Sequence, residues 1–390
     1  MEKRQLCVAQ IGCGAFAAGQ DLPNFQANPR VTCKWCCDVN EENARQLAAR
    51  FSVPRVTTDF RDIMRDPEVD FIKIATSHEA HLPLITAAAE AGKHVFCEKP
   101  LALEEHEALL IIRAVRQGKI KLCVDLNRRM SPALQTLKQR WLAHRAHPVS
   151  QPWRYVETER DLYPEELRTQ FLVRVQDDTL SYRMVHLDPL RGGGQIIGES
   201  VHWLDVACWL YAPQIPVEIQ AWGSTRFSHG IQLTFSAGDT ATILFHCGGT
   251  FDYPKELYEI TCQGGLFRSE FFIENQYYGV PGLEYDRFKL LREDRTEIDV
   301  DWSFAEYLAQ LQARMRKLDS TLAGYQSLMI NKGWAAMLDG FVSAILDDTP
   351  SPCDEMAGYL STYLAKLAIQ SIQTRQALPV PLEKVCFTVL

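Results

Sequence analysis

Lys99, Glu199 and His202 are side chains that can carry out acid–base chemistry. The motif Glu98-Lys99-Pro100 ends a strand-like run, where an ammonium group can hydrogen-bond a substrate hydroxyl and stabilise its charge as a proton leaves. Glu199, His202 and Asp205 are three residues apart, a spacing that predicts one shared helix face. An imidazole between two carboxylates can be tuned to act as a general base near neutral pH.

Metal binding is an alternative for the same three helix residues, since histidine and carboxylates suit several divalent ions. A solvated polar helix face is another. Cys33 and Cys36 form a C-x-x-C pair, but no second pair follows at zinc-like spacing, and VTCKWCCDV is typical of a buried strand. We therefore expect no metal site.

A glycine-rich motif, Gly12 to Ala17, follows the first strand-like run and opens a helix. Gly12 permits a tight turn, and Gly14 leaves room for a pyrophosphate. The second strand ends in Asp38, 21 residues past Ala17, where a carboxylate accepts hydrogen bonds from the ribose hydroxyls and opposes a 2′-phosphate. The pattern predicts NAD rather than NADP, although Asp38 could instead be only a helix N-cap. The cofactor residues predicted here are Gly12, Gly14, Ala15, Phe16 and Asp38.

Residues 1–125 alternate apolar strand-like runs with amphipathic helices, which predicts a parallel sheet covered on both faces, a Rossmann dinucleotide-binding domain. Ligands bind outside the carboxyl ends of strands in such sheets. Further cofactor contacts are therefore expected from Thr76, His78, His81, Glu98 and Lys99.

Residues 126–390 have a different pattern from residues 1–125, because strand-like runs with period-two alternation lie between helical segments. This pattern predicts an α/β domain for substrate binding and oligomerisation, with an open, mostly antiparallel sheet. Arg128 and Arg129 follow the last Rossmann strand and could reach the nicotinamide or substrate, or form salt bridges at a hinge. The substrate-binding residues predicted are Lys99, Asn127, Arg128, His186, Glu199, His202 and Asp205.

The chain has 390 residues and a formal net charge of −8. It lacks the positive field that nucleic-acid or anionic-membrane binding needs, and no apolar stretch is long enough to span a bilayer. The charged N-terminus has no leader-like apolar core, so we expect a cytoplasmic protein. An open sheet favours a homo-oligomer.

The chain resembles the glucose–fructose oxidoreductase, inositol dehydrogenase and MocA (Gfo/Idh/MocA) family over essentially its whole length. The resemblance rests on IGCGAFA, AGKHVFCEKPLAL, DLNRRMSPA and GGGQIIGESVHWLD. It implies NAD(P) at the glycine loop and hydride transfer at a sugar or cyclitol carbon, with the family lysine at Lys99 and its acid–base histidine at His202. The family's aspartate commonly lies four residues before that histidine, where this chain has Gly198; Glu199 resembles a G-E-x-x-H variant of one branch.

Three functions remain open at this stage. The first is an NAD-dependent oxidoreductase acting on a secondary alcohol of a sugar, cyclitol or sugar derivative. The second is an NAD-dependent glycoside-cleaving enzyme that oxidises, eliminates and re-reduces, which needs a second base. Candidates for that base are Tyr155, Tyr163, Tyr182 and His186. The third is a noncatalytic NAD-sensing module, which would require neither Lys99 nor His202.

Overall fold

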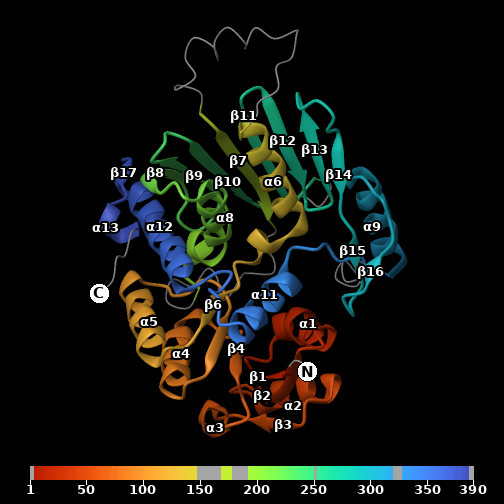
Figure 1. The fold of residues 1–390 in the computed structure, drawn as a ribbon, viewed down its shortest axis with the longest axis vertical. Coiled ribbons are helices and arrows are strands. Elements are labelled where there is room, and N and C mark those ends of the chain that lie inside the picture. Colours follow the sequence, from red (N-terminus) through yellow and green to blue (C-terminus); the bar gives the residue numbers. More distant parts are fainter. Residues whose placement is uncertain (1–3, 147–167, 178–191, 250–252, 319–326, 386–390) are drawn as a thin grey trace.

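In the computed structural model the described residues are 4–146, 168–177, 192–249, 253–318 and 327–385. Two sheets dominate the fold, one in the lower half of Figure 1 and one in the upper half. Among the helices of the described residues, none has the length and apolar character that crossing a membrane would require.

The first sheet is parallel, with six strands in the order β3-β2-β1-β4-β5-β6. This order is that of dinucleotide-binding domains, in which the crevice opens beside the first strand. Its central strands are buried on both faces, as expected for near-continuous apolar runs. The strands are β1 (Leu6–Ile11), β2 (Val31–Cys37), β3 (Arg55–Thr57), β4 (Phe71–Ile74), β5 (His94–Cys97) and β6 (Leu122–Val124).

Helices from the first 125 residues cover this sheet. They are η1 (Ala17–Asp21), α1 (Leu22–Ala27), α2 (Glu41–Phe51), α3 (Phe60–Arg65), η2 (His78–Ala80), α4 (His81–Glu90) and α5 (Glu105–Gly118). A later helix, α11 (Trp334–Leu346), also packs here: the ring of Phe341 lies 5.7 Å from those of both Phe71 and Phe96. The C-terminal segment therefore completes the covering of the first sheet.

The second sheet has nine strands in the order β14-β13-β12-β11-β7-β10-β9-β8-β17, and only β7 and β10 pair in parallel. The structure confirms the predicted open, mostly antiparallel sheet. The strands are β7 (Gln170–Asp177), β8 (Pro216–Gly223), β9 (His229–Phe235), β10 (Thr240–Cys247), β11 (Glu256–Cys262), β12 (Gly265–Glu270), β13 (Glu274–Tyr278), β14 (Tyr285–Arg287) and β17 (Leu378–Pro379). A separate hairpin joins β15 (Leu290–Leu291) and β16 (Glu297–Ile298).

Helices cover one face of this second sheet. Its strands accordingly alternate buried and exposed side chains. On β10, Ala241, Ile243 and Phe245 are buried, whereas Leu244 between them is exposed. The helices of this half are η3 (Asn127–Met130), α6 (Pro132–Ala146), η6 (Ile196–Ser200), α8 (Val201–Tyr211), α9 (Phe304–Leu318), α12 (Glu355–Thr374) and α13 (Leu382–Val385). α6, α8 and α12 lie beside the second sheet (Figure 1), with α6 against β12, α8 against β10 and α12 against β8. α12 also contacts α5 and β6, so it links the two halves near η6 and α8.

Candidate active site between the two sheets

The glycine loop has the geometry that a dinucleotide requires. Gly12 has φ of +91°, and a Cβ atom on it would lie 2.3 Å from the carbonyl oxygen of Ala75, so only glycine fits. A Cβ on Gly14 would meet nothing within 4 Å, and Gly14, Ala15 and Phe16 are exposed. This open rim at the carboxyl end of β1 can receive a pyrophosphate.

Asp38 is fixed beside that loop. One oxygen of its carboxylate accepts a hydrogen bond from the backbone N–H of Cys13 at 2.8 Å, and the other from that of Asn40 at 2.9 Å. The N-cap of α2 is Asn40, whose side chain accepts from the N–H of Glu42. The alternative of Asp38 as a mere N-cap is therefore wrong. A carboxylate has about four lone-pair positions, so Asp38 keeps capacity for ribose hydroxyls.

The other residues predicted to contact the cofactor from the strand ends differ in how deeply they are buried. Thr76, Glu98 and Lys99 are partly exposed at the ends of β4 and β5. His81 is fully buried, its Nδ1 lies 2.9 Å from the carbonyl oxygen of Pro100, and burial lowers its pKa to about 4. This burial corrects the expectation that His81 touches the cofactor, because His81 instead positions the Lys99-Pro100 segment. His78 is also buried, with its ring 5.7 Å from that of His81.

Lys99 and Glu199 meet across the two halves of the molecule. Their Nζ and Oε1 atoms are 2.7 Å apart, and the same Nζ donates to the carbonyl oxygen of Gly198 at 2.5 Å. Glu199 lies on η6, a π-helical turn that leads into α8. Such wide turns accommodate an extra residue in a helix and are frequent at functional sites. The turn brings Glu199 to the lysine although this chain has Gly198 where the family pattern has aspartate.

His202 lies one turn further, 6% exposed. Its Nδ1 has no hydrogen-bond partner among the described residues. Burial, and then the charges of Arg128, Lys99 and Lys332, lower its pKa well below 6.5, so the imidazole is neutral.

Both carboxylates predicted beside His202, Glu199 and Asp205, are paired with cations. Asp205 is 2% exposed and bonds Arg129, with Oδ2 3.0 Å from Nε, while Glu199 bonds Lys99. α8 is buried on most of its surface and has no solvated polar face. Cations therefore dominate the field at the imidazole, because cations from other segments neutralise both carboxylates.

Two side chains that the sequence did not single out, Glu256 and Lys332, complete the surroundings of His202. Glu256 is fully buried and bonds Arg128 through Nε and Nη2 at 2.7 and 2.9 Å, and Lys332 through Nζ at 2.8 Å. Although burial raises the pKa of Glu256, Arg128 and Lys332 hold it well below 4.5. Both Arg128 and Arg129 thus make the interior salt bridges that were the alternative to ligand contact. We call Arg128, Glu256 and Lys332 the cation cluster.

Asn127 lies against this cluster. Its Nδ2 donates to the carbonyl oxygen of Lys332 at 2.8 Å, and its buried Oδ1 has no partner among the described residues. The predicted substrate contact His186, and the second-base candidates Tyr155, Tyr163 and Tyr182, lie outside the described residues. The described part of the chain thus brings together Lys99, Asn127, Glu199 and His202.

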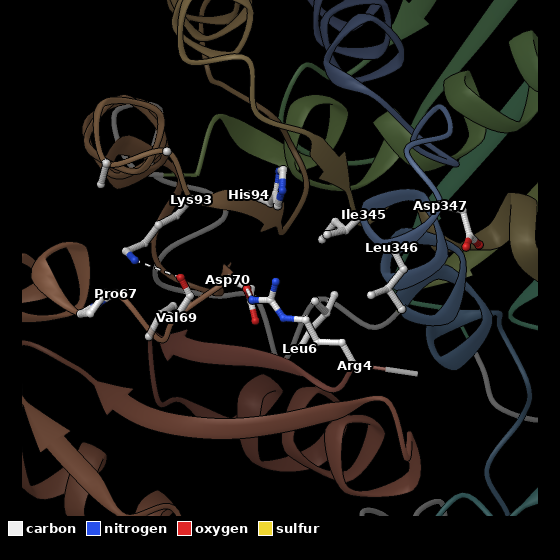
Figure 2. A pocket seen from close by; sticks show the side chains of 12 residues that line it. Arg4, Leu6, Pro67, Val69, Asp70, Lys93, His94, Ile345, Leu346 and Asp347 are labelled. Atoms are coloured by element: carbon white, nitrogen blue, oxygen red, sulfur yellow. Dashed lines mark hydrogen bonds and ion pairs between the residues drawn. The ribbon is translucent and has the colours of Figure 1, made fainter. Parts of the chain in front are cut away.

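A hollow of about 680 Å³ lies elsewhere, at the amino ends of β4 and β5. Figure 2 shows Asp70, His94 and Ile345 among its lining residues, with Lys93 donating to the carbonyl oxygen of Val69. Because ligands of such sheets bind at the carboxyl ends, this hollow is on the wrong edge for the cofactor.

Fold and glycine loop together define a two-domain protein of the dinucleotide-binding class. Residues 6–126 match the model of a family described as "Oxidoreductase family, NAD-binding Rossmann fold". The first domain is thus similar to the NAD-binding domain of the Gfo/Idh/MocA oxidoreductases, and this match supports NAD as the cofactor.

Curated relatives match over parts of their length. Levoglucosan dehydrogenase of Pseudarthrobacter phenanthrenivorans is 39% identical over 106 residues, 27% of each chain. Myo-inositol 2-dehydrogenase of Thermotoga maritima is 27% identical over 205 residues, 53% of this chain and 54% of that protein. The matched part thus spans about a quarter to about half of these relatives.

Solved structures match over nearly the whole chain. A levoglucosan dehydrogenase in complex with NADH and levoglucosan has a TM-score of 0.73 at 18% identity, covering 97% of this chain and 100% of that one. An aldose-aldose oxidoreductase of Caulobacter crescentus has a TM-score of 0.72 at 16% identity, with the same coverage. At such identities the likeness shows the shared fold alone.

Proposed function

We propose that this protein is an NAD-dependent oxidoreductase that transfers hydride between the nicotinamide and a secondary alcohol carbon of a sugar, cyclitol or sugar derivative. The observation that carries the proposal is the Lys99–Glu199 pair, at 2.7 Å, formed across the crevice beside the neutral His202. The relatives named as levoglucosan and myo-inositol dehydrogenases support the substrate class.

His202 is the proposed base. A neutral imidazole with an unpartnered ring nitrogen can accept the proton of a substrate hydroxyl. Lys99 would donate a hydrogen bond to that oxygen and stabilise its developing negative charge. Glu199 orients the ammonium, and Asp205 stabilises the helix through Arg129 rather than acting on substrate. Bound NAD supplies the acceptor for the hydride that leaves the same carbon.

The cofactor residues of this proposal are those of the exposed rim and the strand ends. Gly12, Gly14, Ala15 and Phe16 would hold the pyrophosphate side, and Asp38 the adenosine ribose. We assign residues 1–125 to the cofactor domain and 126–390 to substrate binding and oligomerisation. The face of the second sheet that carries the exposed Leu244 would pair two copies in a cytoplasmic homo-oligomer.

The test supplies NAD with a panel of free sugars, cyclitols and aryl glycosides. Stoichiometric NADH absorbance with at least one sugar or cyclitol is expected. Aglycone release without NADH accumulation, with solvent deuterium entering the carbon next to the oxidised one, would instead establish the glycoside-cleaving reaction. NAD binding without turnover on any compound would favour the noncatalytic module.

A further inference from the structure

A second lysine near the crevice is surrounded by three carboxylates. The side chain of Lys73 on β4 is 0% exposed, and its Nζ lies 2.7 Å from Glu98, 2.9 Å from Asp125 and 3.4 Å from Asp21. Gln10 donates to Asp21 at 3.1 Å. These four charged residues, Asp21, Lys73, Glu98 and Asp125, are called the carboxylate cluster below.

The charges of this cluster do not balance, since three carboxylates face one ammonium group. A further cation that interacts with Asp21, Arg295, donates its hydrogen bonds to Asn24 at 2.6 Å and to the carbonyl oxygen of Gly19 at 2.7 Å. Three carboxylates in contact with one buried ammonium cannot all ionise at low cost. Burial raises the pKa of Asp21 to about 6 and that of Glu98 well above 4.5, while Lys73 stays charged. The cluster therefore carries excess negative charge, which proton uptake by a carboxylate reduces as pH falls.

A metal ion is not the explanation of this arrangement. The three carboxylates do offer oxygens within 4.8 Å of one another. However, the Lys73 ammonium contacts all three and takes the position that a cation would need. One oxygen of Asp125 and the Oε1 of Gln10 are buried with no partner among the described residues.

The cluster borders the nicotinamide side of the crevice. Lys73 Nζ is 5.9 Å from the ring of Phe16 on the glycine loop, and the Glu98 side chain is 12% exposed directly before Lys99. Asp38, directly after β2, marks the adenosine side. Because the sheet order continues from β1 to β4 and β5, the other half of a dinucleotide must lie over the strand ends that carry this cluster.

We propose that the carboxylate cluster is an electrostatic counter-charge for the nicotinamide, and that Glu98 is the positioning residue through which it stabilises the oxidised, cationic ring relative to the neutral reduced ring. The inference rests on the NAD binding of the proposed function. Unlike Lys99, Glu98 has no place in the proton transfer.

The experiment measures the dissociation constants of NAD+ and NADH for the whole protein by calorimetric titration. Glu98→Gln keeps the shape of the side chain and removes its charge. The variant should bind NAD+ more weakly relative to NADH. The dissociation constant of NAD+ divided by that of NADH should therefore rise by about 5- to 10-fold, within the usual range of coupling between sites. Glu68→Gln is the control, because this exposed carboxylate precedes β4 at the opposite edge of the same sheet, and it should leave the ratio unchanged.

The pH dependence gives an independent arm that needs no variant. In the wild type the ratio should fall as pH rises from 5 to 8, because proton loss from a carboxyl group of the cluster adds negative charge that favours NAD+. In Glu98→Gln this slope should diminish. Within the cluster, Glu98 faces Asp21, Lys73 and Asp125. The titratable or charged groups outside the cluster that lie near it or the crevice are Cys97, Lys99, Cys123, His202, Arg295 and Lys332.

The outcomes are separable. Equal weakening of both nucleotides in Glu98→Gln, or an unchanged ratio with a flat wild-type pH profile, would overturn the counter-charge and leave a structural role. If melting temperatures show that Glu98→Gln does not fold, Asp21→Asn provides the same test with the same expected sign. Absence of NAD+ and NADH binding to the wild type would overturn the NAD-dependent function itself. Turnover on a sugar with an unchanged ratio would overturn only this inference.

Discussion

Two lysines near the ends of neighbouring strands have opposite surroundings. Lys73 is enclosed by three carboxylates with its side chain 0% exposed, whereas Lys99 contacts one carboxylate and is 13% exposed. The two surroundings meet in one motif: Glu98 bonds Lys73, and the next residue is Lys99, which bonds Glu199. The contrast shows that the chain surrounds one ammonium with excess negative charge and leaves the next partly exposed beside a single carboxylate.

The same contrast extends across the crevice. The carboxylate cluster carries excess negative charge in the first half of the molecule, while in the cation cluster Arg128 and Lys332 share the single carboxylate of Glu256. In the proposed oxidation a positive ring is consumed on the first side and a negative alkoxide develops on the second. Each half thus has the sign that suits the charge it would face.

The largest expected effect comes from removing the base on the cationic side. His202→Ala should lower kcat by roughly 100- to 10,000-fold, the range of general acid–base catalysis. The exposed His106 on α5 is the matched control, and His106→Ala should retain wild-type turnover. Steady-state rates with the substrate found by the panel test this, and an active His202→Ala variant would remove His202 as the base.

The pH dependence of kcat/KM also tests the role of His202 as the base. A base must be neutral, and burial with neighbouring cations holds the pKa of His202 well below 6.5. kcat/KM should therefore stay level as pH falls through 6.5 and decline only below it. A decline centred at 6.5 or above would show that the cations of the surrounding segments do not act on the imidazole as the structure indicates.

Lys99→Met should cost about 100- to 1,000-fold in turnover, as expected for one electrostatic stabiliser, and leave NAD affinity within about a few fold. Its ammonium bonds Glu199 and the carbonyl oxygen of Gly198. The control is Lys366→Met, a lysine on α12 paired with Glu104. A parallel loss of NAD binding in Lys99→Met would place this lysine with the cofactor and end its contrast with Lys73.

A smaller effect is expected from Asp38, on the adenosine side of the crevice. The wild type should prefer NAD(H) over NADP(H) by about ten- to a hundredfold, because one repelled charge is worth ~1–3 kcal/mol. Asp38→Asn should reduce the preference to about a few fold, whereas Glu41→Gln, at an exposed carboxylate on the following helix, should not. Nicotinamide fluorescence titrations measure both, and equal wild-type affinities would show that Asp38 does not select the ribose.

The sequence predicted what depends on local pattern. Strand and helix periodicity gave both sheets, and the glycine spacing gave the loop beside Asp38. The partners of buried charges could not be predicted from the sequence. Glu256 bonds Arg128 and Lys332, which lie 128 and 76 positions away along the chain, and no local pattern encodes such pairings. For the same reason the neutralisation of Asp205 by Arg129 reversed the expected field at His202.

Removal of metal ions should have no effect, and this result would separate acid–base chemistry from metal chemistry at Glu199, His202 and Asp205. Metal ligation by Glu199, His202 and Asp205 would require both carboxylates to leave buried ion pairs, with Lys99 at 2.7 Å and with Arg129. Breaking such pairs leaves uncompensated buried charges, which typically costs about 3–5 kcal/mol each. Dialysis against a chelator should therefore leave turnover and melting temperature unchanged. Activity that is lost to the chelator and restored by one divalent ion would mean that these carboxylates bind metal, and that the cationic field assigned to His202 is not the one under which it works.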